Sequence, residues 1–363
     1  MEGMEMNFYD VYKCKKVLVT GHTGFKGSWL CEWLLSLGAE VYGFALEPPT
    51  QPALFDQLGL DKRIVDHTVG DIRDRKVVET VVCDLQPDFI FHLAAQPLVR
   101  LSYSCPVETF ETNVMGTVNL LDACRLLDKK CNVICVTTDK CYENTENGRA
   151  YVETDPMGGY DPYSCSKGCD ELVIASYRRS FFNSSESKIW LASARAGNVI
   201  GGGDWSMDRI VPDAIRALAQ GESIPVRNKN STRPWQHVLD PLCGYLTLGS
   251  ALAKRERFSE VCGGFNFGPD PNANRTVENL VEAMLGHMNG SWVDVSEPNA
   301  VHEATLLNLD IRKAAEVLGW KPTWGFRKTI FAVCEWYEGV LFCEKEARKI
   351  TLKQIKEFEE WMS

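Results

Sequence analysis

The chain has 363 residues, of which 45% are hydrophobic and 10% aromatic, so it is long enough for one large domain or two fused domains. Its formal net charge of −10 argues against nucleic acid or an anionic membrane as a partner. No stretch approaches the roughly 18 apolar residues of a membrane span, and the amino-terminal residues lack the apolar segment of a signal peptide. Fourteen cysteines are scattered without the spacing of a metal site, which predicts reduced thiols, no bound metal and a cytoplasmic protein.

The first 200 residues alternate short apolar runs with amphipathic stretches. Strands are predicted at 16–20, 40–45, 67–69, 88–93, 132–137 and 189–194, and helices at 25–37, 74–85, 107–128 and 162–182. This alternation predicts an α/β fold, namely a doubly wound parallel sheet of the Rossmann type with helices on both faces.

Glycine and proline clusters interrupt this pattern after Gly201. We therefore expect a Rossmann domain over residues 14–200, to which the chain returns at about 236–268, and a smaller, irregular substrate-binding cap over residues 201–363. The cap ends in a predicted helix, in which Thr351 and Gln354 match the spacing of a capping box.

Three glycines follow the first predicted strand with the spacing G-x-x-G-x-x-G. Gly21 permits a tight turn, Gly24 lets backbone approach a pyrophosphate, and Gly27 lets the next helix pack against the strand. Unpaired N–H groups at the start of that helix favour phosphate. Between a strand and a helix, this motif indicates a dinucleotide site.

The residues after the second predicted strand bear on which dinucleotide binds. Glu47 follows this strand, and no Arg or Lys lies between Val41 and Asp61. A 2′-phosphate would therefore lack a cationic partner, which favours NAD over NADP.

Two further strand ends are candidates for cofactor contact. After the third strand, Asp71 and Ile72 are suited to cover the adenine, although Asp71 fits the N-cap of a helix equally well. The fourth strand ends in small residues that leave room for a cofactor or simply pack tightly, in the run Leu93, Ala94 and Ala95.

Tyr163 and Lys167 lie four residues apart in a predicted helix, so their side chains share one face. A phenol has a reference pKa of about 10, and a neighbouring ammonium together with the nicotinamide cation favours the phenolate. Tyr163 is therefore a candidate base for a sugar hydroxyl whose carbon loses a hydride, while Lys167 holds the nicotinamide ribose.

Thr138, Asp139 and Lys140 follow the fifth predicted strand, at the sheet edge where parallel sheets bind ligands. Thr138 can hydrogen-bond the reacting hydroxyl, and Asp139 can act as an acid. The alternative is that Asp139 and Lys140 form only a solvated turn pair.

Six longer runs are more specific than these short motifs. They are Thr20–Gly27, Ala45–Thr50, Ala94–Arg100, Thr138–Tyr142, Arg195–Trp205 and Arg233–Val238. With them the chain resembles the extended short-chain dehydrogenase/reductases that act on nucleotide sugars, and among these the CDP-glucose 4,6-dehydratases, from Lys16 to about Trp324. The resemblance implies NAD as a cofactor that stays bound, with Thr23 and Phe25 among its contacts.

The resemblance also implies a dehydration. C4 of the glucose is oxidised with Tyr163 as the base, water is lost across C5 and C6, and the hydride returns to C6 to give a 4-keto-6-deoxy sugar. Related dTDP-glucose dehydratases have Asp-Glu where this chain has Asp139-Lys140. Asp139 can still protonate the departing hydroxyl, whereas Lys140 either takes the C5 proton, if burial lowers its pKa, or stabilises the enolate.

By the same resemblance, Asn198, Arg209 and Arg233 contact the nucleotide diphosphate, to which guanidinium groups bind through forked hydrogen bonds. For Arg209 the alternative is a surface ion pair with Asp208 or Asp213.

The resemblance further implies a homodimer or a tetramer, formed through the helices at 107–128 and 162–182. Other activities stay open at this point: dehydration of dTDP-glucose or GDP-mannose, epimerisation, or dinucleotide binding without turnover. Asp139-Lys140 favours dehydration, because an epimerase needs no acid for a leaving hydroxyl, and the intact Tyr163 and Lys167 argue against a protein without turnover. The choice of cytosine depends on the resemblance, since no motif identifies the base physically.

Overall fold

A parallel sheet of seven strands forms the centre of the computed structural model, which describes residues 8–145, 148–270, 273–296, 307–343 and 345–362. The strands are β1 (Lys16–Thr20), β2 (Glu40–Ala45), β3 (Asp66–Val69), β4 (Phe89–His92), β5 (Cys131–Thr137), β7 (Ile189–Arg195) and β12 (Gly264–Asn266). Their spatial order is β12-β7-β5-β4-β1-β2-β3, and all neighbours are parallel. This order confirms the predicted doubly wound sheet and places its switch point between β1 and β4.

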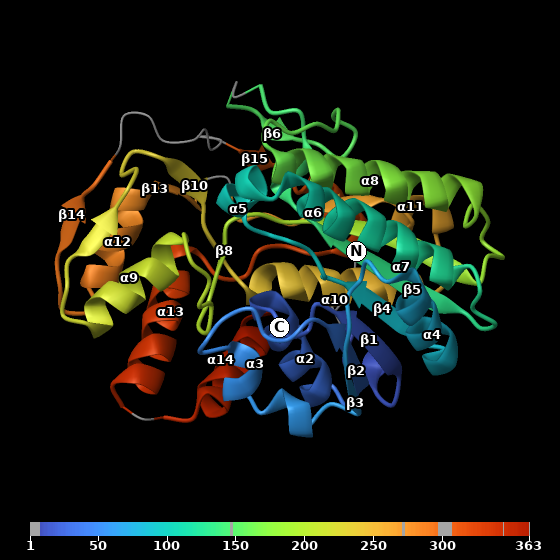
Figure 1. The fold of residues 1–363 in the computed structure, drawn as a ribbon, viewed down its shortest axis with the longest axis horizontal. Coiled ribbons are helices and arrows are strands. Elements are labelled where there is room, and N and C mark those ends of the chain that lie inside the picture. The colour runs from blue at the N-terminus through green and yellow to red at the C-terminus, as the bar shows by residue number, and fades with distance from the viewer. Residues whose placement is uncertain (1–7, 146–147, 271–272, 297–306, 344, 363) are drawn as a thin grey trace.

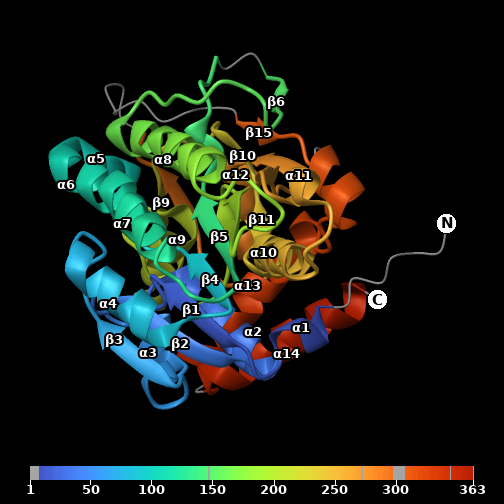
Figure 2. The ribbon, with the colours of Figure 1, turned by 90° about the vertical axis from the view of Figure 1, so that its right-hand side faces the viewer.

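Helices cover both faces of the sheet (Figure 1, Figure 2). One face carries α2 (Phe25–Ser36) and α10 (Leu239–Ala253), and the other carries α4 (Arg75–Leu85), α7 (Gly116–Cys124) and α8 (Pro162–Ser180). In β1, Val17 and Val19 pack with the first set, whereas Leu18 packs with the second. Successive side chains of a strand face opposite sides, so this continuous apolar strand requires helices on both. The short helices α1 (Tyr9–Tyr12) and α3 (Leu54–Gln57) precede β1 and follow β2.

The helix predicted at 107–128 is interrupted. This region contains α5 (Val99–Ser104), α6 (Pro106–Phe110), a wide π-helical turn (Glu111–Met115) and α7. The buried side chain of Asn113 explains the wide turn: it accepts from the Gln96 N–H and donates to Ser166 Oγ, both at 2.8 Å. Asn113 thereby ties the loop after β4 to α8.

Short elements make up most of the chain after residue 200. They are β8 (Val199–Ile200), α9 (Ile210–Ala219), β9 (Ile224–Val226), β10 (Thr232–Pro234), β11 (Gln236–His237), α11 (Phe258–Val261), β13 (Asn274–Thr276), α12 (Val277–Leu285), β14 (Trp292–Asp294), β15 (Asn308–Leu309), a π-helical turn (Ala314–Leu318) and α13 (Phe326–Leu341). Their strands pair two by two: β8 with β11, β9 with β14, β10 with β13, and β15 with β6 (Ala150–Tyr151). Within the described ranges, no helix has the length and apolar character needed to cross a membrane.

The terminal helix α14 (Ala347–Met362) packs against α2 and α13. The predicted capping box is wrong, because the helix begins one turn earlier and both residues are buried within it. Thr351 Oγ1 accepts from Trp336 Nε1 at 3.0 Å, and Gln354 Nε2 donates to the Ala332 carbonyl at 2.8 Å. The two polar side chains therefore fasten α14 to α13.

Candidate active site

The turn between β1 and α2 brings backbone segments very close together. Gly21 has φ = +74°, and a Cβ atom there would lie 2.7 Å from the Ala94 nitrogen. At Gly27 a Cβ would lie 2.3 Å from the Gly21 oxygen, so neither position accepts a side chain. At Gly24 a Cβ would meet only that same oxygen, at 3.4 Å. Because no side chain caps α2, its first N–H groups beside Gly24 are available to a phosphate.

The loop after β4 borders this turn. Thr20 Oγ1 accepts from two backbone N–H groups of the loop at 3.2 Å, which fixes the loop against the end of β1. Thr23 is buried and donates to the Leu46 carbonyl at 3.0 Å, so it anchors the turn to the end of β2. The other residues expected at the cofactor here are half-buried, namely Phe25, Leu93, Ala94 and Ala95.

Asp71 does not cap a helix, so that alternative is wrong. Asp74 caps α4 instead, because its carboxylate accepts from the N–H groups of Lys76 and Val77 at 3.0 and 3.2 Å. Arg73 binds the Asp71 carboxylate, with Nη2 2.6 Å from Oδ2. This hydrogen bond lowers the pKa of Asp71.

The other residues expected near the adenosine differ in exposure. Ile72 is buried against Gly116, where a Cβ would lie 2.7 Å from Ile72 Cγ2. Glu47 is exposed in the segment after β2. A ligand that contacts the Asp71 carboxylate would have to share it with Arg73.

The start of α8 positions the tyrosine and the lysine. The Asp161 carboxylate accepts from the Ser164 N–H at 2.9 Å, and Pro162 occupies the first helical position, where no N–H is needed. Tyr163 and Lys167 lie one turn apart on this helix and are both buried. Their phenol and ammonium groups interact electrostatically.

A buried ion pair, which the motif did not predict, holds this lysine. Lys167 Nζ donates to Asp170 Oδ2 at 2.8 Å, and the two side chains are 6% and 1% exposed. Burial is the largest single influence and opposes the ammonium form, but the attraction and hydrogen bond of Asp170, together with the attractions of Tyr163 and Cys135, outweigh it and raise the pKa of Lys167. The sequence signal is the spacing of three residues between a base and an acid on one helix.

Thr138, Asp139 and Lys140 lie at the carboxyl end of β5. Thr138 Oγ1 donates to Asp139 Oδ1 at 2.9 Å, and Asn198 Nδ2 lies 3.5 Å from the other carboxylate oxygen. Asp139 is 1% exposed and packs against Gly197, where a Cβ would lie 1.9 Å from Oδ2. Lys140 Nζ is 3.9 Å from Asp139 Oδ1, and 23% of its side chain is exposed. The alternative that Asp139 and Lys140 form only a solvated turn pair is therefore wrong, because the Asp139 carboxylate is buried and hydrogen-bonded.

Arg209 stands at the start of α9 and faces the tyrosine. Its Nη1 donates to Asp204 Oδ2 at 2.9 Å. Arg209 therefore forms an ion pair, but with Asp204 and not with Asp208 or Asp213, so the partners named in that alternative are wrong. The Asp204 carboxylate raises the pKa of the Arg209 guanidinium, which also interacts with Tyr163. Arg209 is thus held by Asp204 within electrostatic range of Tyr163.

Lys26 joins these residues, although the glycine motif alone did not mark it as functional. It lies in the first turn of α2, and its ammonium interacts with Arg209, Asp139 and Lys167. Burial and then the nearby Arg209 lower the pKa of Lys26 to about 8. The available signal was that Lys26 is the only Lys, Arg, Asp or Glu between Thr20 and Gly27.

A pocket opens beside Asp139, with about 590 Å³ of empty space that includes open solvent. The segments after β7 and β12, together with β11, β13 and β15, provide most of its lining, which includes Gly197, Gln236, Asp270, Asn274 and Asn308. Gln236 Nε2 donates to the Gly197 carbonyl at 2.8 Å, which joins two walls. Arg233 directly precedes the lining residue Pro234 in β10, and its Nη1 donates to the Thr232 carbonyl at 3.2 Å.

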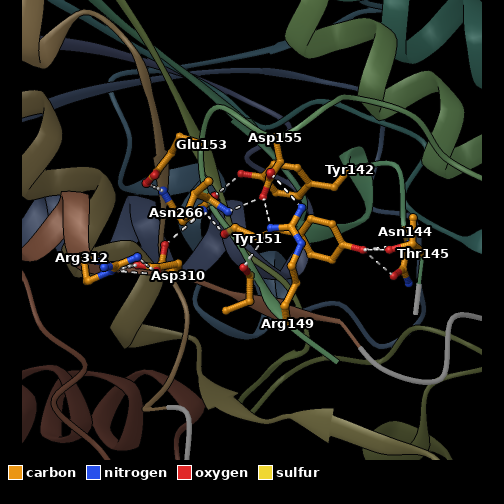
Figure 3. Close-up of polar contacts among 12 residues, drawn as sticks. Tyr142, Asn144, Thr145, Arg149, Tyr151, Glu153, Asp155, Asn266, Asp310 and Arg312 are labelled. Carbon is orange, nitrogen blue, oxygen red and sulfur yellow. Dashed lines mark hydrogen bonds and ion pairs between the residues drawn. The ribbon is translucent and has the colours of Figure 1, made fainter. Parts of the chain in front are cut away.

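A network of polar contacts fixes the arm that carries β6 (Figure 3). Tyr142 Oη donates to Asn266 Oδ1 at 2.7 Å. Asn266 Nδ2 in turn donates to the carbonyls of Tyr151 and Asp310, at 2.9 and 3.1 Å. These bonds connect the residues just after Asp139 to β12 and to the segment after β15, and so hold two walls of the pocket together.

Comparisons with known proteins agree with this geometry. The family model for GDP-mannose 4,6 dehydratase matches residues 18–332. The chain is also 47% identical, over 343 residues, to CDP-glucose 4,6-dehydratase from Salmonella typhimurium, with 91% of this chain and 94% of that protein covered. Both findings confirm the family resemblance that the sequence motifs indicated.

Solved structures share the fold. DesIV, a dTDP-glucose 4,6-dehydratase from Streptomyces venezuelae solved with NAD and TYD bound, has a TM-score of 0.76 at 23% identity, over 89% of this chain and 97% of that one. UDP-glucose 4-epimerase from Thermotoga maritima has a TM-score of 0.76 at 22% identity, over 90% of this chain and 99% of that one. On the family match and the 47% relative, the chain belongs to the GDP-mannose 4,6-dehydratase family of extended short-chain dehydrogenase/reductases.

Proposed function

We propose that the chain is an NAD-dependent hydro-lyase that converts CDP-glucose to CDP-4-keto-6-deoxyglucose and water. The observation that carries the proposal is that two chemistries meet around Lys26, whose ammonium interacts with both Lys167 and Asp139. Tyr163 with Lys167 suits oxidation of a hydroxyl carbon, and the buried Asp139 suits protonation of a leaving hydroxyl. The 47% identity to a CDP-glucose 4,6-dehydratase supports CDP-glucose as the substrate.

The turn after β1 fits the pyrophosphate of NAD. Backbone leaves no room for a Cβ at Gly21 and Gly27, while Gly24 is open beside the uncapped start of α2. When bound there, NAD would supply a reversible hydride acceptor for oxidation at C4 and reduction at C6. We assign the cofactor to residues 14–200 and the substrate mainly to residues 201–363. The remaining cofactor contacts are assigned to Thr23, Phe25, Asp71, Ile72, Leu93, Ala94 and Ala95.

Oxidation at C4 requires a base and a group that orients the hydroxyl. Tyr163 accepts the proton of the C4 hydroxyl, and the Lys167 ammonium stabilises the phenolate that does so. Thr138 Oγ1 donates to Asp139 Oδ1, so its lone pairs can accept from the substrate while that bond persists. The same residues hold the hydroxyl in one orientation for the whole step.

Elimination of water requires an acid for the C6 hydroxyl and stabilisation of the enolate. Asp139 lies beside the pocket and is assigned as the acid. Lys140 Nζ lies 3.9 Å from Asp139 Oδ1, and 23% of the lysine side chain is exposed. We assign Lys140 to electrostatic stabilisation of the enolate. The C5 proton, which the 4-keto group acidifies, is assigned to water in the open pocket beside Asp139.

The nucleotide diphosphate needs cations, because the chain as a whole carries a net charge of −10. Arg209 and Arg233 are assigned to this role, with Asn198 as a hydrogen-bond donor. Arg209 is the better placed of the two arginines, since its guanidinium interacts with Tyr163 and is held by Asp204.

One assay tests the substrate and the reaction together. Purified protein is offered CDP-, dTDP-, GDP- and UDP-glucose, and GDP-mannose, each with deuterium at C4, and the products are analysed by mass spectrometry and NMR. We expect loss of one water from CDP-glucose, with the deuterium transferred to C6. A product that keeps its C6 oxygen would contradict dehydration and favour epimerisation. Turnover of another nucleotide sugar, but not of CDP-glucose, would contradict the proposed substrate.

We also propose that the protein is a cytoplasmic homodimer. Exposed apolar side chains gather on α5 to α8, namely Leu101, Tyr103, Val107, Met115 and Leu172. All fourteen cysteines are free thiols, which suits a reducing compartment. Light scattering after gel filtration tests the dimer: Leu172→Glu should give a monomer, whereas an unchanged mass would place the interface elsewhere.

A further inference from the structure

A line of buried side chains connects Lys167 to the end of β1. Lys167 Nζ donates to Asp170 Oδ2 at 2.8 Å, and Asp170 Oδ1 lies 3.0 Å from Thr117 Oγ1. Thr117 Oγ1 is 3.2 Å from His92 Nε2, and His92 Nδ1 is 2.7 Å from Thr20 Oγ1. All five side chains are buried, and they belong to α8, α7, β4 and β1. The line therefore crosses the switch point of the sheet.

The proton count fixes the direction of this line. Thr20 Oγ1 already accepts from two backbone N–H groups, so its own proton points to His92 Nδ1. Burial lowers the pKa of His92 to about 3, so the ring is neutral and its one proton lies on Nε2, toward Thr117. Thr117 Oγ1 has two acceptors in reach, the Asn113 carbonyl at 2.8 Å and Asp170 Oδ1 at 3.0 Å, and its proton goes to Asp170 because a carboxylate is the stronger acceptor. The Asp170 carboxylate thus accepts a hydrogen bond on each oxygen, an arrangement that suits its ionised form.

Other ionisable groups face this pair from every neighbouring element. They are Tyr163 and Glu171 on α8, His92 on β4, Cys135 on β5 and Lys26 on α2. Glu171 is paired with Arg195 at 2.7 Å, and burial raises the pKa of Cys135 so that its thiol is neutral. Asp170 is therefore the negative group that directly balances the Lys167 ammonium beside Tyr163.

We infer that Asp170 is a positioning residue for the C4 oxidation, which holds the Lys167 ammonium charged beside Tyr163 and balances the charge that reaches the phenolate. This inference rests on the proposed roles of Lys167 and Tyr163. Without the carboxylate, the buried lysine would lose its proton more readily, and the phenolate would lie near one negative charge fewer. Removal of Asp170 should therefore move the titration of both groups to lower pH.

Asp170→Asn is a suitable variant because the surrounding hydrogen bonds can be kept. Lys167 can still donate to the amide oxygen. The amide nitrogen can donate to Thr117 Oγ1, because the Thr117 hydroxyl can turn its proton to the Asn113 carbonyl at 2.8 Å. Asp170→Ala serves as a second variant that removes the charge and the hydrogen bonds together.

The test follows the two groups directly by NMR, in the full chain with isotope-labelled lysine and tyrosine and without substrate. Lys167→Arg and Tyr163→Phe identify the signals. In Asp170→Asn and Asp170→Ala we expect the titration midpoints of both signals to fall by about one pH unit or more. Asp122→Asn, which removes a carboxylate paired with Arg75 and Arg125 on the outer side of α7, should leave both midpoints unchanged.

The pH dependence of turnover gives the second measurement. Both limbs of the profile for CDP-glucose should shift to lower pH in Asp170→Asn, whereas a purely structural role would change the rate and leave the limbs in place. Unchanged midpoints in both variants would overturn the inference even if the wild-type protein is an active dehydratase. If the midpoints shift but the protein converts no nucleotide sugar, the role of Asp170 toward Lys167 stands and the proposed function is wrong.

Discussion

Two lysine–aspartate pairs belong to the candidate site, and they differ in geometry. Lys167 and Asp170 are 2.8 Å apart, with 6% and 1% of their side chains exposed. Lys140 and Asp139 are 3.9 Å apart, and Lys140 is 23% exposed. The first pair is closed by a hydrogen bond, whereas the second is open. A closed pair fixes the position and charge of both members, while an open pair leaves each member free to interact with a ligand.

The surroundings of the two pairs continue this difference. Asp170 is the end of a line of hydrogen bonds that runs through Thr117 to His92. Asp139 instead lines the pocket, and Lys140 directly follows it in the chain. This difference fits the proposed roles, in which the open pair protonates the leaving hydroxyl and the closed pair sets the electrostatic environment of Tyr163.

Asp139→Asn should have the largest effect, because it removes the acid of the open pair. We expect dehydration of CDP-glucose to slow by about 10³-fold, as is usual for loss of a general acid. C4 oxidation should persist, because Tyr163 and Lys167 are untouched. The measurement combines product analysis with the absorbance of the reduced nicotinamide, which should accumulate.

Asp122→Asn is the matched control for this variant, since it makes the same chemical change away from the pocket. It should dehydrate CDP-glucose at the wild-type rate. If Asp139→Asn dehydrates as fast as the wild type, the acid must be another group and the assignment of the open pair is lost.

Asp170→Ala should have the next largest effect, on stability. Breaking a buried pair leaves the Lys167 ammonium without its carboxylate, and we expect the free energy of unfolding to fall by about 3 kcal/mol. Lys140→Ala is the contrasting variant, because a partly exposed pair contributes about 0–1 kcal/mol. Urea unfolding of both proteins at neutral pH gives the comparison, and equal losses would remove the distinction between closed and open pairs.

Lys140 variants test whether the open pair acts through charge or through proton transfer. Lys140→Ala should slow dehydration by about 10- to 100-fold and leave C4 oxidation intact, because the enolate loses a cation. Lys140→Arg should recover most of the rate, since a guanidinium keeps the charge but cannot act as a base at working pH. A Lys140→Arg protein as slow as Lys140→Ala would assign the C5 proton to the lysine.

The elements around β1 were predictable from the sequence because their signals are local. Gly21 and Gly27 mark a turn whose backbone tolerates no Cβ, and the apolar runs of β1 and β2 match the observed strands residue for residue. Tyr163 and Lys167 were selected by their spacing together with their position after Thr138 and Asp139, and both lie in α8 as expected. In each case the information lies within short segments of the sequence.

The parts that were missed depend on contacts between distant segments. The local sequence does not distinguish Asp170 from an acid on a solvated helix face. In the structure it is buried and bonded to Thr117, which lies on another helix. The wide turn at Asn113 exists because Gln96 and Ser166 bind its side chain. The short strands after residue 200 pair with segments far away in the chain, so their own sequences carry little of the cause.

Buried histidines should also make the stability of the protein depend on pH, and this is the smallest effect that we predict. Burial lowers the pKa of His22 to about 4, and that of His92 and His237 to about 3. The unfolded chain binds three more protons at these positions once pH falls below about 6.5, so stability falls with it. Burial raises the pKa of Asp240 to about 7, and this group opposes the trend by one proton, which leaves a net excess of two. The free energy of unfolding should therefore fall by about 2 kcal/mol from pH 6.5 to 5.5, as urea titrations can measure.

His92→Gln should weaken this pH dependence, whereas the control His287→Gln, at an exposed position, should leave it unchanged. If the free energy of unfolding stays flat or rises over this range, the buried rings carry charge in the folded protein. The order of protons from Thr20 to Asp170 would then be wrong as well.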